Sequence, residues 1–374
     1  DTSYKDKNAL ALFQFSMVIT TEGINGKSTI QPYPGKKNSL VNDCNDNETL
    51  SNALLYKSTP NYAIGHGCAA QWDCVNNEVV NIYTAILLTY EVPSITPDIS
   101  LSDGTALKVS MRDLLYLDFD EKDNIGSNNL NTVISAYSDW IAKKNKEGQN
   151  LETHYQKQAL INLGECEKAC RRMKQGLDIL KSNPNALRAF QLMNKAMWLQ
   201  QQHAPRDKLR NYRIEDGEVE VEKVDFTVDA NDKKRALNKI DSQWRAFQIG
   251  FVLMSLASVV NENDDYNQNV ELIWFPTGGG KTEAYLGLAA FNMLYQRLTE
   301  KSEVGVQVLM RYTLRLLTAQ QLQRAATLVC ALESFRESEE IPGGEFSIGL
   351  WVGSSTSPNR NNDAVKALKE LNKN

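Results

Sequence analysis

The spacing of apolar residues divides the chain into regions with different periods. Over 130–205, apolar residues recur at i, i+3, i+4 and i+7, which predicts a helical region. Its last helix is expected to open at Pro184, because proline fits the first turn of a helix but removes a hydrogen bond from its interior. The preceding residues, 1–129, hold apolar stretches separated by Asn, Gly and Pro, which predicts a mixed, β-rich module. Within it, the very polar run Asn42–Asn52 predicts an exposed loop.

After about residue 240, short β-type runs alternate with helical patterns. Three apolar runs predict buried strands of a parallel sheet, at 272–275, 304–310 and 346–352, and a helical pattern follows each. The charged segment 206–240 contains the period-two run Glu218–Glu222, which predicts a linker or an edge hairpin. The expected fold is therefore an α/β lobe over 241–374, preceded by the linker, the helical region and the β-rich module.

Composition and charge narrow the class of protein only slightly. The chain of 374 residues is long enough for two or three domains, and 42% of its residues are hydrophobic. No apolar run approaches the roughly 18 residues needed to cross a bilayer, and Asp1–Asp6 lacks the features of a signal peptide. We therefore expect a cytoplasmic protein with no membrane partner, whose natural beginning precedes Asp1. The formal net charge of −5 argues against a DNA-coating protein, but not against a motor with a local cationic groove.

The cysteines and histidines do not form a pattern typical of a metal site. Cys166 and Cys170 lie one helical turn apart, but no second pair stands at zinc-ligand spacing. Free and mostly buried thiols are the expectation. His66 and Cys68 lie close together within Tyr62–Trp72, where a packed structural loop is favoured over a Cys-His nucleophile, which needs further partners in space.

A glycine-rich stretch between a predicted strand and a predicted helix is the main candidate for chemistry. Gly278, Gly279 and Gly280 are followed directly by Lys281 and Thr282. Glycines let the backbone turn its N–H groups around an anion, and the start of a helix adds partial positive charge. Lys281 is then suited to hold the β- and γ-phosphates of ATP, and the Thr282 hydroxyl to ligate Mg²⁺.

This stretch is similar to motif I of superfamily 2 helicases, which reads Pro-Thr-Gly-x-Gly-Lys-[Ser/Thr]. Phe275 occupies the first glycine position of the stricter phosphate-loop pattern. Upstream, Trp244–Gln248 resembles the cluster whose glutamine reads adenine, a task suited to an amide that both donates and accepts. The resemblance implies a RecA-like parallel-sheet motor lobe that binds ATP and Mg²⁺. The candidate nucleotide-binding residues are Gln248, Thr277, Gly278, Gly279, Gly280, Lys281, Thr282 and Glu283, with Lys281 and Thr282 catalytic and Thr282 as the magnesium ligand.

The segment after the second predicted strand resembles helicase motif Ia, with Tyr312 in place of its usual proline. Hydroxyl groups and N–H groups at a helix start are suited to gripping DNA phosphates without reading sequence. Small residues beyond the third predicted strand stand where open α/β sheets bind ligands. The candidate DNA-binding residues are Thr313, Arg315, Gln320, Gly353 and Thr356.

Several segments taken together resemble a more specific family. They are Gly65–Trp72, Tyr90–Pro93, Trp244–Gln248, Trp274–Leu286, Met310–Thr318 and Gly349–Gly353. In this order they resemble the DrmA family, the helicase-like subunits of the DISARM bacterial anti-phage system. The resemblance implies ATP-driven translocation on or remodelling of phage DNA, single-stranded or with a single-stranded end, and association with a DrmB-type partner subunit.

The chain departs from the helicase pattern in one respect. No acidic motif for Mg²⁺ follows Lys281, since the only later Asp is Asp363, and no second lobe with its arginine finger is visible. We therefore expect that the chain ends within the first motor lobe. Two alternatives stay open: a phosphate-loop phosphotransferase, and a non-catalytic scaffold that binds ATP to order a partner interface.

Overall fold

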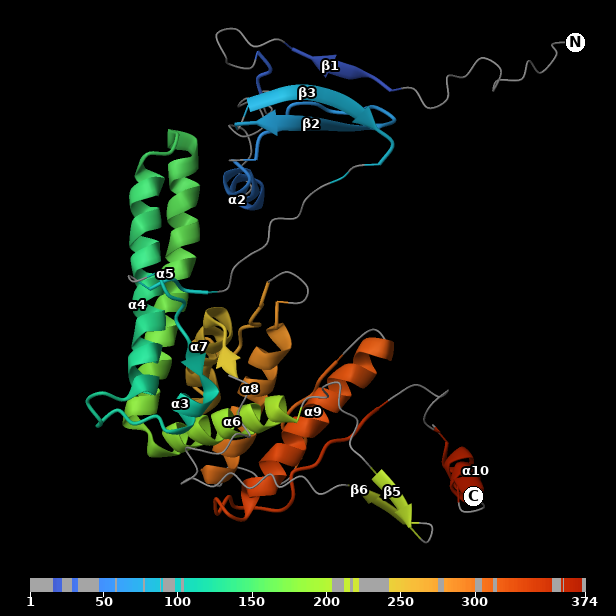
Figure 1. Ribbon diagram of the computed structural model, residues 1–374. Coiled ribbons are helices and arrows are strands. Elements are labelled where there is room, and N and C mark those ends of the chain that lie inside the picture. The colour runs from blue at the N-terminus through green and yellow to red at the C-terminus, as the bar shows by residue number, and fades with distance from the viewer. Residues whose placement is uncertain are drawn as a thin grey trace, which may run out of the picture. The chain divides into compact units, whose positions relative to one another are not determined.

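A computed structural model describes residues 16–21, 29–32, 47–57, 59–76, 78–87, 89, 98–101, 104–203, 212–215, 218–221, 242–274, 279–299, 305–311, 315–351, 358 and 360–371 (Figure 1). These residues form a mixed α/β structure in which helices predominate and the sheets are small and antiparallel. The chain divides into two units, one within Asp1–Thr96 and Trp140–Cys166 and the other within Pro97–Asp139 and Glu167–Asn374. The four segments predicted from the sequence, with boundaries near 129, 205 and 240, stay a prediction.

The first unit contains an antiparallel sheet with strand order β1-β3-β2 (Figure 1). Its strands are β1 (Val18–Thr20), β2 (Ala69–Val75) and β3 (Glu78–Ala85). Ile82 of the central strand lies opposite Ile19 on one side and Trp72 on the other. Tyr62 packs edge-on against Trp72, with ring centroids 5.5 Å apart. The β-strands expected near the start of the chain are therefore present in its described part.

A short helix, α2 (Asn47–Leu55), lies where the sequence predicts a loop. The loop predicted over Asn42–Asn52 is therefore wrong from residue 47 onward. The hydroxyl of Ser51 on this helix exchanges hydrogen bonds with the amide of Asn162, at 3.1 and 3.3 Å. This contact joins residues far apart in the sequence, so the polar composition of the segment does not reveal it.

The loop before β2 turns back closely on itself. A Cβ atom added to Gly65 would lie 2.0 Å from the carbonyl oxygen of Cys68. The side chains of His66 and Cys68 are both exposed. The close backbone packing favours a structural loop.

The cysteines are less buried than expected. All those that the structure describes carry free thiols, which are exposed at Cys68, Cys74 and Cys330. Within the described part of the chain, only Cys170 is buried. The expectation of mostly buried thiols is therefore wrong, whereas that of free thiols is confirmed for the described residues.

The predicted helical region consists of three helices. They are α4 (Ile125–Gln149), α5 (Thr153–Ser182) and α6 (Pro184–Gln202), and the first two contribute residues to both units. As predicted, Pro184 begins α6, and the side chain of Asn183 caps it by accepting a hydrogen bond from the Ala186 N–H at 3.1 Å. Most of α6 is buried, including Phe190, Met193 and Met197. It therefore forms the core of the second unit.

The second unit also contains several further helices. They are α3 (Met111–Leu115), α7 (Ala246–Val260), α8 (Lys281–Leu298), α9 (Arg315–Arg336) and α10 (Asn361–Leu371). Helix α6 packs against α3, α8 and α9, and α7 packs against α8 (Figure 1). The described part of the unit also contains two antiparallel strand pairs. One pairs β4 (Val109–Ser110) with β7 (Gln243–Trp244), and the other pairs β5 (Tyr212–Glu215) with β6 (Glu218–Val221). Among the helices that the structure describes, none carries an apolar stretch long enough to cross a membrane.

The helices expected after residue 240 are confirmed, but the predicted strands differ. The described parts of these three runs, at 272–274, 305–310 and 346–351, pair with no strand. Most of their large apolar side chains are exposed, with exposed fractions of 83% for Trp274, 83% for Val306 and 96% for Trp351, whereas Phe346 is only 8% exposed. A β-strand requires a hydrogen-bonded neighbour, and the described residues supply none here. The parallel RecA-like sheet stays a prediction.

Candidate functional site

The glycine-rich loop leads directly into the first turn of α8. Gly280 is the N-cap residue, with a φ of 87°, in the left-handed region that side chains other than glycine rarely adopt. It offers no side chain to cap the helix, so the first N–H groups of α8 receive no such capping bond. Lys281 and Thr282 follow in the first turn, and both are half-buried. This is the backbone arrangement that the glycine pattern predicts for an anion site.

Two side chains from the start of α7 hold the carbonyl groups of this loop. Arg245 Nη1 donates to the Gly279 carbonyl oxygen at 2.6 Å, and Gln248 Nε2 donates to the Gly280 carbonyl oxygen at 2.6 Å. The Oε1 atom of Gln248 accepts from the Arg245 backbone N–H at 2.8 Å. Both ends of the Gln248 amide are therefore used, and the residue is only 3% exposed.

These two hydrogen bonds fix the direction of two peptide groups. In a trans peptide, the C=O and the following N–H point in opposite directions. Because the carbonyls of Gly279 and Gly280 point toward α7, the N–H groups of Gly280 and Lys281 point away from it. Two adjacent N–H donors that point the same way form a concave site for an anion.

The position of Arg245 and Gln248 follows from the packing of Trp244. In the β4–β7 ladder, Trp244 lies opposite Val109, and its indole Nε1 donates to Asn194 Oδ1 of α6 at 2.7 Å. Asn194 and Trp244 are both buried, with exposed fractions of 0% and 2%. A Cβ on Gly287 of α8 would lie 2.7 Å from Trp244 Cη2, so the indole needs a glycine there. The buried indole thereby joins α6, α8 and the start of α7.

A cavity of about 250 Å³ lies beside the start of α7. Its lining combines polar and apolar residues: Asp98, Ile99, Leu107, Val109, Gln201, Gln243, Trp244, Arg245 and Ala246. Arg245 therefore borders the cavity and also contacts the glycine loop.

The first turn of α8 is also tied to α9. Glu283, two residues after Lys281, forms an ion pair and hydrogen bond with Arg324 of α9. The two side chains are partly exposed, at 22% for Glu283 and 32% for Arg324. Arg172 of α5 forms a second ion pair with Glu271, at 2.5 Å, just before the apolar run that precedes the loop. Helix α5 thus contacts the segment before the glycines, and α9 contacts the segment after them.

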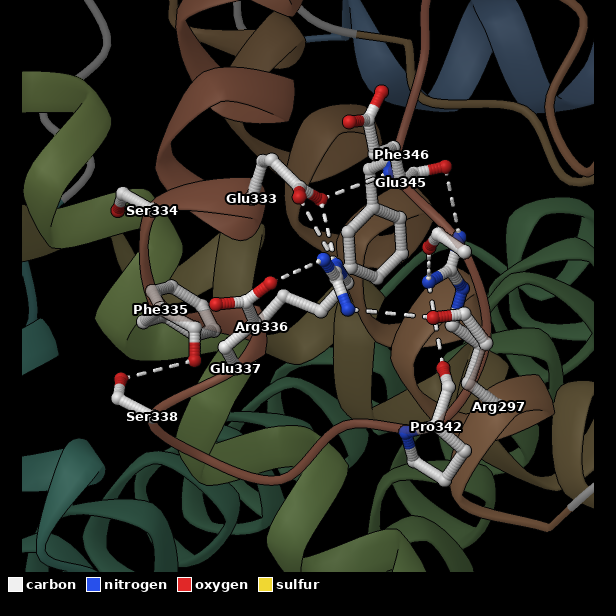
Figure 2. A network of polar contacts seen from close by, with 12 residues as sticks. Arg297, Glu333, Ser334, Phe335, Arg336, Glu337, Ser338, Pro342, Glu345 and Phe346 are labelled. Carbon is white, nitrogen blue, oxygen red and sulfur yellow. Dashed lines mark hydrogen bonds and ion pairs between the residues drawn. The ribbon is translucent and has the colours of Figure 1, made fainter.

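A polar network fixes the other end of α8 (Figure 2). The guanidinium of Arg297 lies 3.6 Å from the Phe346 ring centroid and donates to the carbonyls of Pro342 and Glu345 at 3.4 and 3.3 Å. Glu333 of α9 accepts from the Phe346 N–H at 3.0 Å and pairs with Arg336. The Phe346 N–H, followed by Arg336, holds the pKa of Glu333 below its usual range. The start of the third predicted strand is thereby anchored to α8 and α9.

The structure describes only some of the site residues that were predicted from the sequence. Thr277, Gly278, Thr313, Gly353 and Thr356 lie outside the described residues, as does the side chain of Arg315. Gln248, Gly279, Gly280, Lys281, Thr282 and Glu283 all lie at or beside the start of α8. Gln320 is exposed on α9.

Sequence reasoning did not find Arg245 or Arg324. Arg245 stands in the segment Trp244–Gln248, in which only the glutamine was given a role, so a signal was present. Arg324 lies in an ordinary helical pattern and is identified only by its contact with Glu283.

Mg²⁺ is the one metal that the loop implies. Among the described residues, no group of three or more His, Cys, Asp and Glu side chains is placed to hold a metal on its own. A phosphate loop does not need such a cage, because Mg²⁺ keeps several waters and binds through substrate phosphates and few protein ligands. Thr282 in the first turn of α8 fits the role of such a ligand.

The fold and the site together define a mixed α/β protein with a glycine loop at the start of a helix, held by side chains from a neighbouring helix. No model of a protein family matches the chain. The chain is similar to the DISARM protein DrmA of Bacillus paralicheniformis, with 31% identity over an alignment 398 residues long that covers 98% of this chain. It spans 32% of that relative's length. This similarity supports membership of a DrmA-related family.

Proposed function

We propose that the chain carries the nucleotide-binding loop of an ATP-dependent DNA helicase or translocase, a DrmA-type subunit of a DISARM anti-phage complex. The observation that carries the proposal is the orientation of the glycine loop. Arg245 and Gln248 hold the loop carbonyls on one side, so the N–H groups of Gly280 and Lys281 point to the other. The similarity to DrmA supports the defence role.

In this proposal each residue of the first turn has a separate task. Lys281 holds the γ-phosphate, Thr282 ligates Mg²⁺, and the N–H groups of the loop hold the remaining phosphate oxygens. Gln248 is proposed to contact adenine. Its amide already uses one N–H and one oxygen lone pair on Gly280 and Arg245 and is only 3% exposed, so that contact requires its second N–H and lone pair to become accessible.

The DNA contacts and the partner belong to the same proposal. Thr313, Arg315 and Gln320, near the start of α9, are proposed to grip phosphates of phage DNA, together with Gly353 and Thr356. A DrmB-type subunit is the proposed partner. A RecA-like sheet built on the runs at 272–275, 304–310 and 346–352 is the proposed frame. The open apolar faces of Leu272 and Trp274, 82% and 83% exposed, support it as surfaces suited to strand neighbours.

The test is ATP turnover by the full-length protein with Mg²⁺, with and without single-stranded DNA. Lys281→Ala is expected to lower phosphate release by about a hundredfold or more, the loss typical of a preorganised charge-stabilising donor. Lys122→Ala is the matched control, since Lys122 is an exposed lysine before α4 and far from the loop in sequence. Undiminished phosphate release by the Lys281 variant would refute the assignment.

The same assay separates the alternatives. A phosphotransferase would show no stimulation by DNA and would phosphorylate a small acceptor. A scaffold would bind ATP in equilibrium dialysis and release no phosphate. Either result would replace the helicase proposal, while DNA-stimulated turnover that depends on Lys281 would support it.

A further inference from the structure

We propose that the Glu283–Arg324 ion pair couples the nucleotide loop to α9, so that nucleotide affinity and DNA affinity depend on one another. Arg324 acts here as a positioning residue that contacts neither ligand. The inference rests on the proposed function, because it assumes that the loop binds nucleotide and that the start of α9 contacts DNA.

The first step of the argument is the location of Glu283. It stands in the first turn of α8, directly after Thr282. Its Oε2 atom lies 3.4 Å from the position that a Cβ on Gly280 would occupy. A carboxylate this close to an anion site repels a triphosphate unless a cation neutralises it. Arg324 supplies that cation through a hydrogen-bonded ion pair.

The second step is the location of Arg324. It lies in the same continuous helix as Arg315 and Gln320, which stand at the end proposed to contact DNA. A helix behaves as a rigid rod over this length, so a shift at one end moves the other. Helix α8 also packs directly against α9. A change at the first turn of α8 therefore has a physical route to the DNA-facing end of α9.

The third step is the setting of the pair. Exposed fractions of 22% and 32% place it between a screened surface pair and a fully buried one. Such a pair forms and breaks at modest cost, which suits a contact that differs between two states. By reciprocity, a pair that changes DNA affinity when nucleotide binds must change nucleotide affinity by the same factor when DNA binds.

The experiment compares wild-type, R324Q, E283R and E283R/R324E forms of the full-length protein. DNA affinity is measured by filter binding of a radiolabelled single-stranded oligonucleotide, with and without the non-hydrolysable analogue AMP-PNP and Mg²⁺. The ratio of the two Kd values reports the coupling. R324Q is expected to change this Kd ratio about fivefold, bringing it closer to one, because it removes the partly exposed Glu283–Arg324 ion pair. The charge swap is expected to restore much of it.

R188Q is the matched control. Arg188 pairs with Glu339, beyond the opposite end of α9, and the exposed fractions of that pair are 42% and 21%. Its loss removes an ion pair near α9 without touching the loop, although Lys195 still pairs with Glu339, so the ratio should stay at the wild-type value.

The possible outcomes separate the two proposals. A wild-type ratio that survives in R324Q, or that falls equally in R188Q, would overturn the role of the pair and leave the proposed function intact. A wild-type protein that bound neither AMP-PNP nor DNA would overturn the proposed function and the coupling together. Loss in R324Q with recovery in the charge swap would support the coupling, since the Kd ratio would then follow the presence of the ion pair rather than the identity of either residue.

Discussion

Gly176 of α5 is predicted to tolerate no side chain, because the backbone of α7 lies directly against it. A Cβ atom at Gly176 would lie 2.0 Å from the Leu253 carbonyl oxygen and 2.8 Å from its carbonyl carbon. Both are backbone atoms, so no change of rotamer can relieve the contact. The helices would have to separate by about 1 Å, given that carbon and oxygen rarely approach within about 3 Å.

The net effect of Gly176→Ala combines two opposing terms. Alanine gains about 1 kcal/mol over glycine in the interior of a helix. Overpacking against a rigid neighbour typically costs about 1–3 kcal/mol and occasionally more, and a backbone contact at 2.0 Å falls at the upper end. We therefore expect a net destabilisation of about 2 kcal/mol. Helix α7 also carries Gln248 at its start, so nucleotide binding should weaken as well.

Gly164 provides a matched control on the same helix. A Cβ atom there would meet nothing within 4 Å, so Gly164→Ala should stabilise by about 0.5–1 kcal/mol. The two variants are compared by urea unfolding followed by circular dichroism, with hydrogen exchange to locate the change in α5 and α7. Effects of the same sign in both variants would refute the argument from α5–α7 spacing.

Three further predictions concern the second unit. Glu340→Gly should stabilise by about 0.5–1 kcal/mol in urea unfolding, because Glu340 adopts a φ of 52° in the left-handed turn that ends α9; no gain would show that this turn is unstrained. Trp244→Phe should destabilise by about 1–3 kcal/mol in thermal unfolding, because it leaves the buried Asn194 acceptor without its donor; a neutral effect would contradict that account. Burial raises the pKa of Glu339. Its hydrogen bonds and charge interactions with Lys195 and Arg188 outweigh the effect of burial and hold the pKa below its usual 4.5. The Glu339 carboxylate therefore contributes to stability above pH 4.5, and this contribution is lost as the pH falls through the folded-state pKa. Glu339→Gln should flatten that part of the curve of stability against pH. An unchanged curve would contradict this prediction.

Periodic patterns predicted the helices of the region 130–205 and those that follow the three apolar runs, but not α2. The opening of α6 at Pro184 and the presence of a helix after the glycines both follow from local rules about proline, glycine and helix ends. These features depend on residues adjacent in the sequence, so one chain is sufficient to find them.

Long-range contacts were not predictable in the same way. The links from Trp244 to Asn194 and from Glu283 to Arg324 join residues of different helices, and no spacing rule connects them. Gln248 was found through a resemblance, but the sequence did not indicate that its amide bonds to the loop backbone. Strand pairing of the run at 272–275 is the harder case, because a strand depends on a neighbour that a local pattern cannot identify.

The exposed apolar runs also give the protein a spectroscopic reporter. Of its six tryptophans, Trp274 and Trp351 are 83% and 96% exposed, whereas Trp244 and Trp198 are 2% and 8% exposed. The first two should therefore emit at long wavelength and be quenched by acrylamide, while the buried indoles should not. Any neighbour that covers these runs should shift the emission to the blue and protect it from quenching.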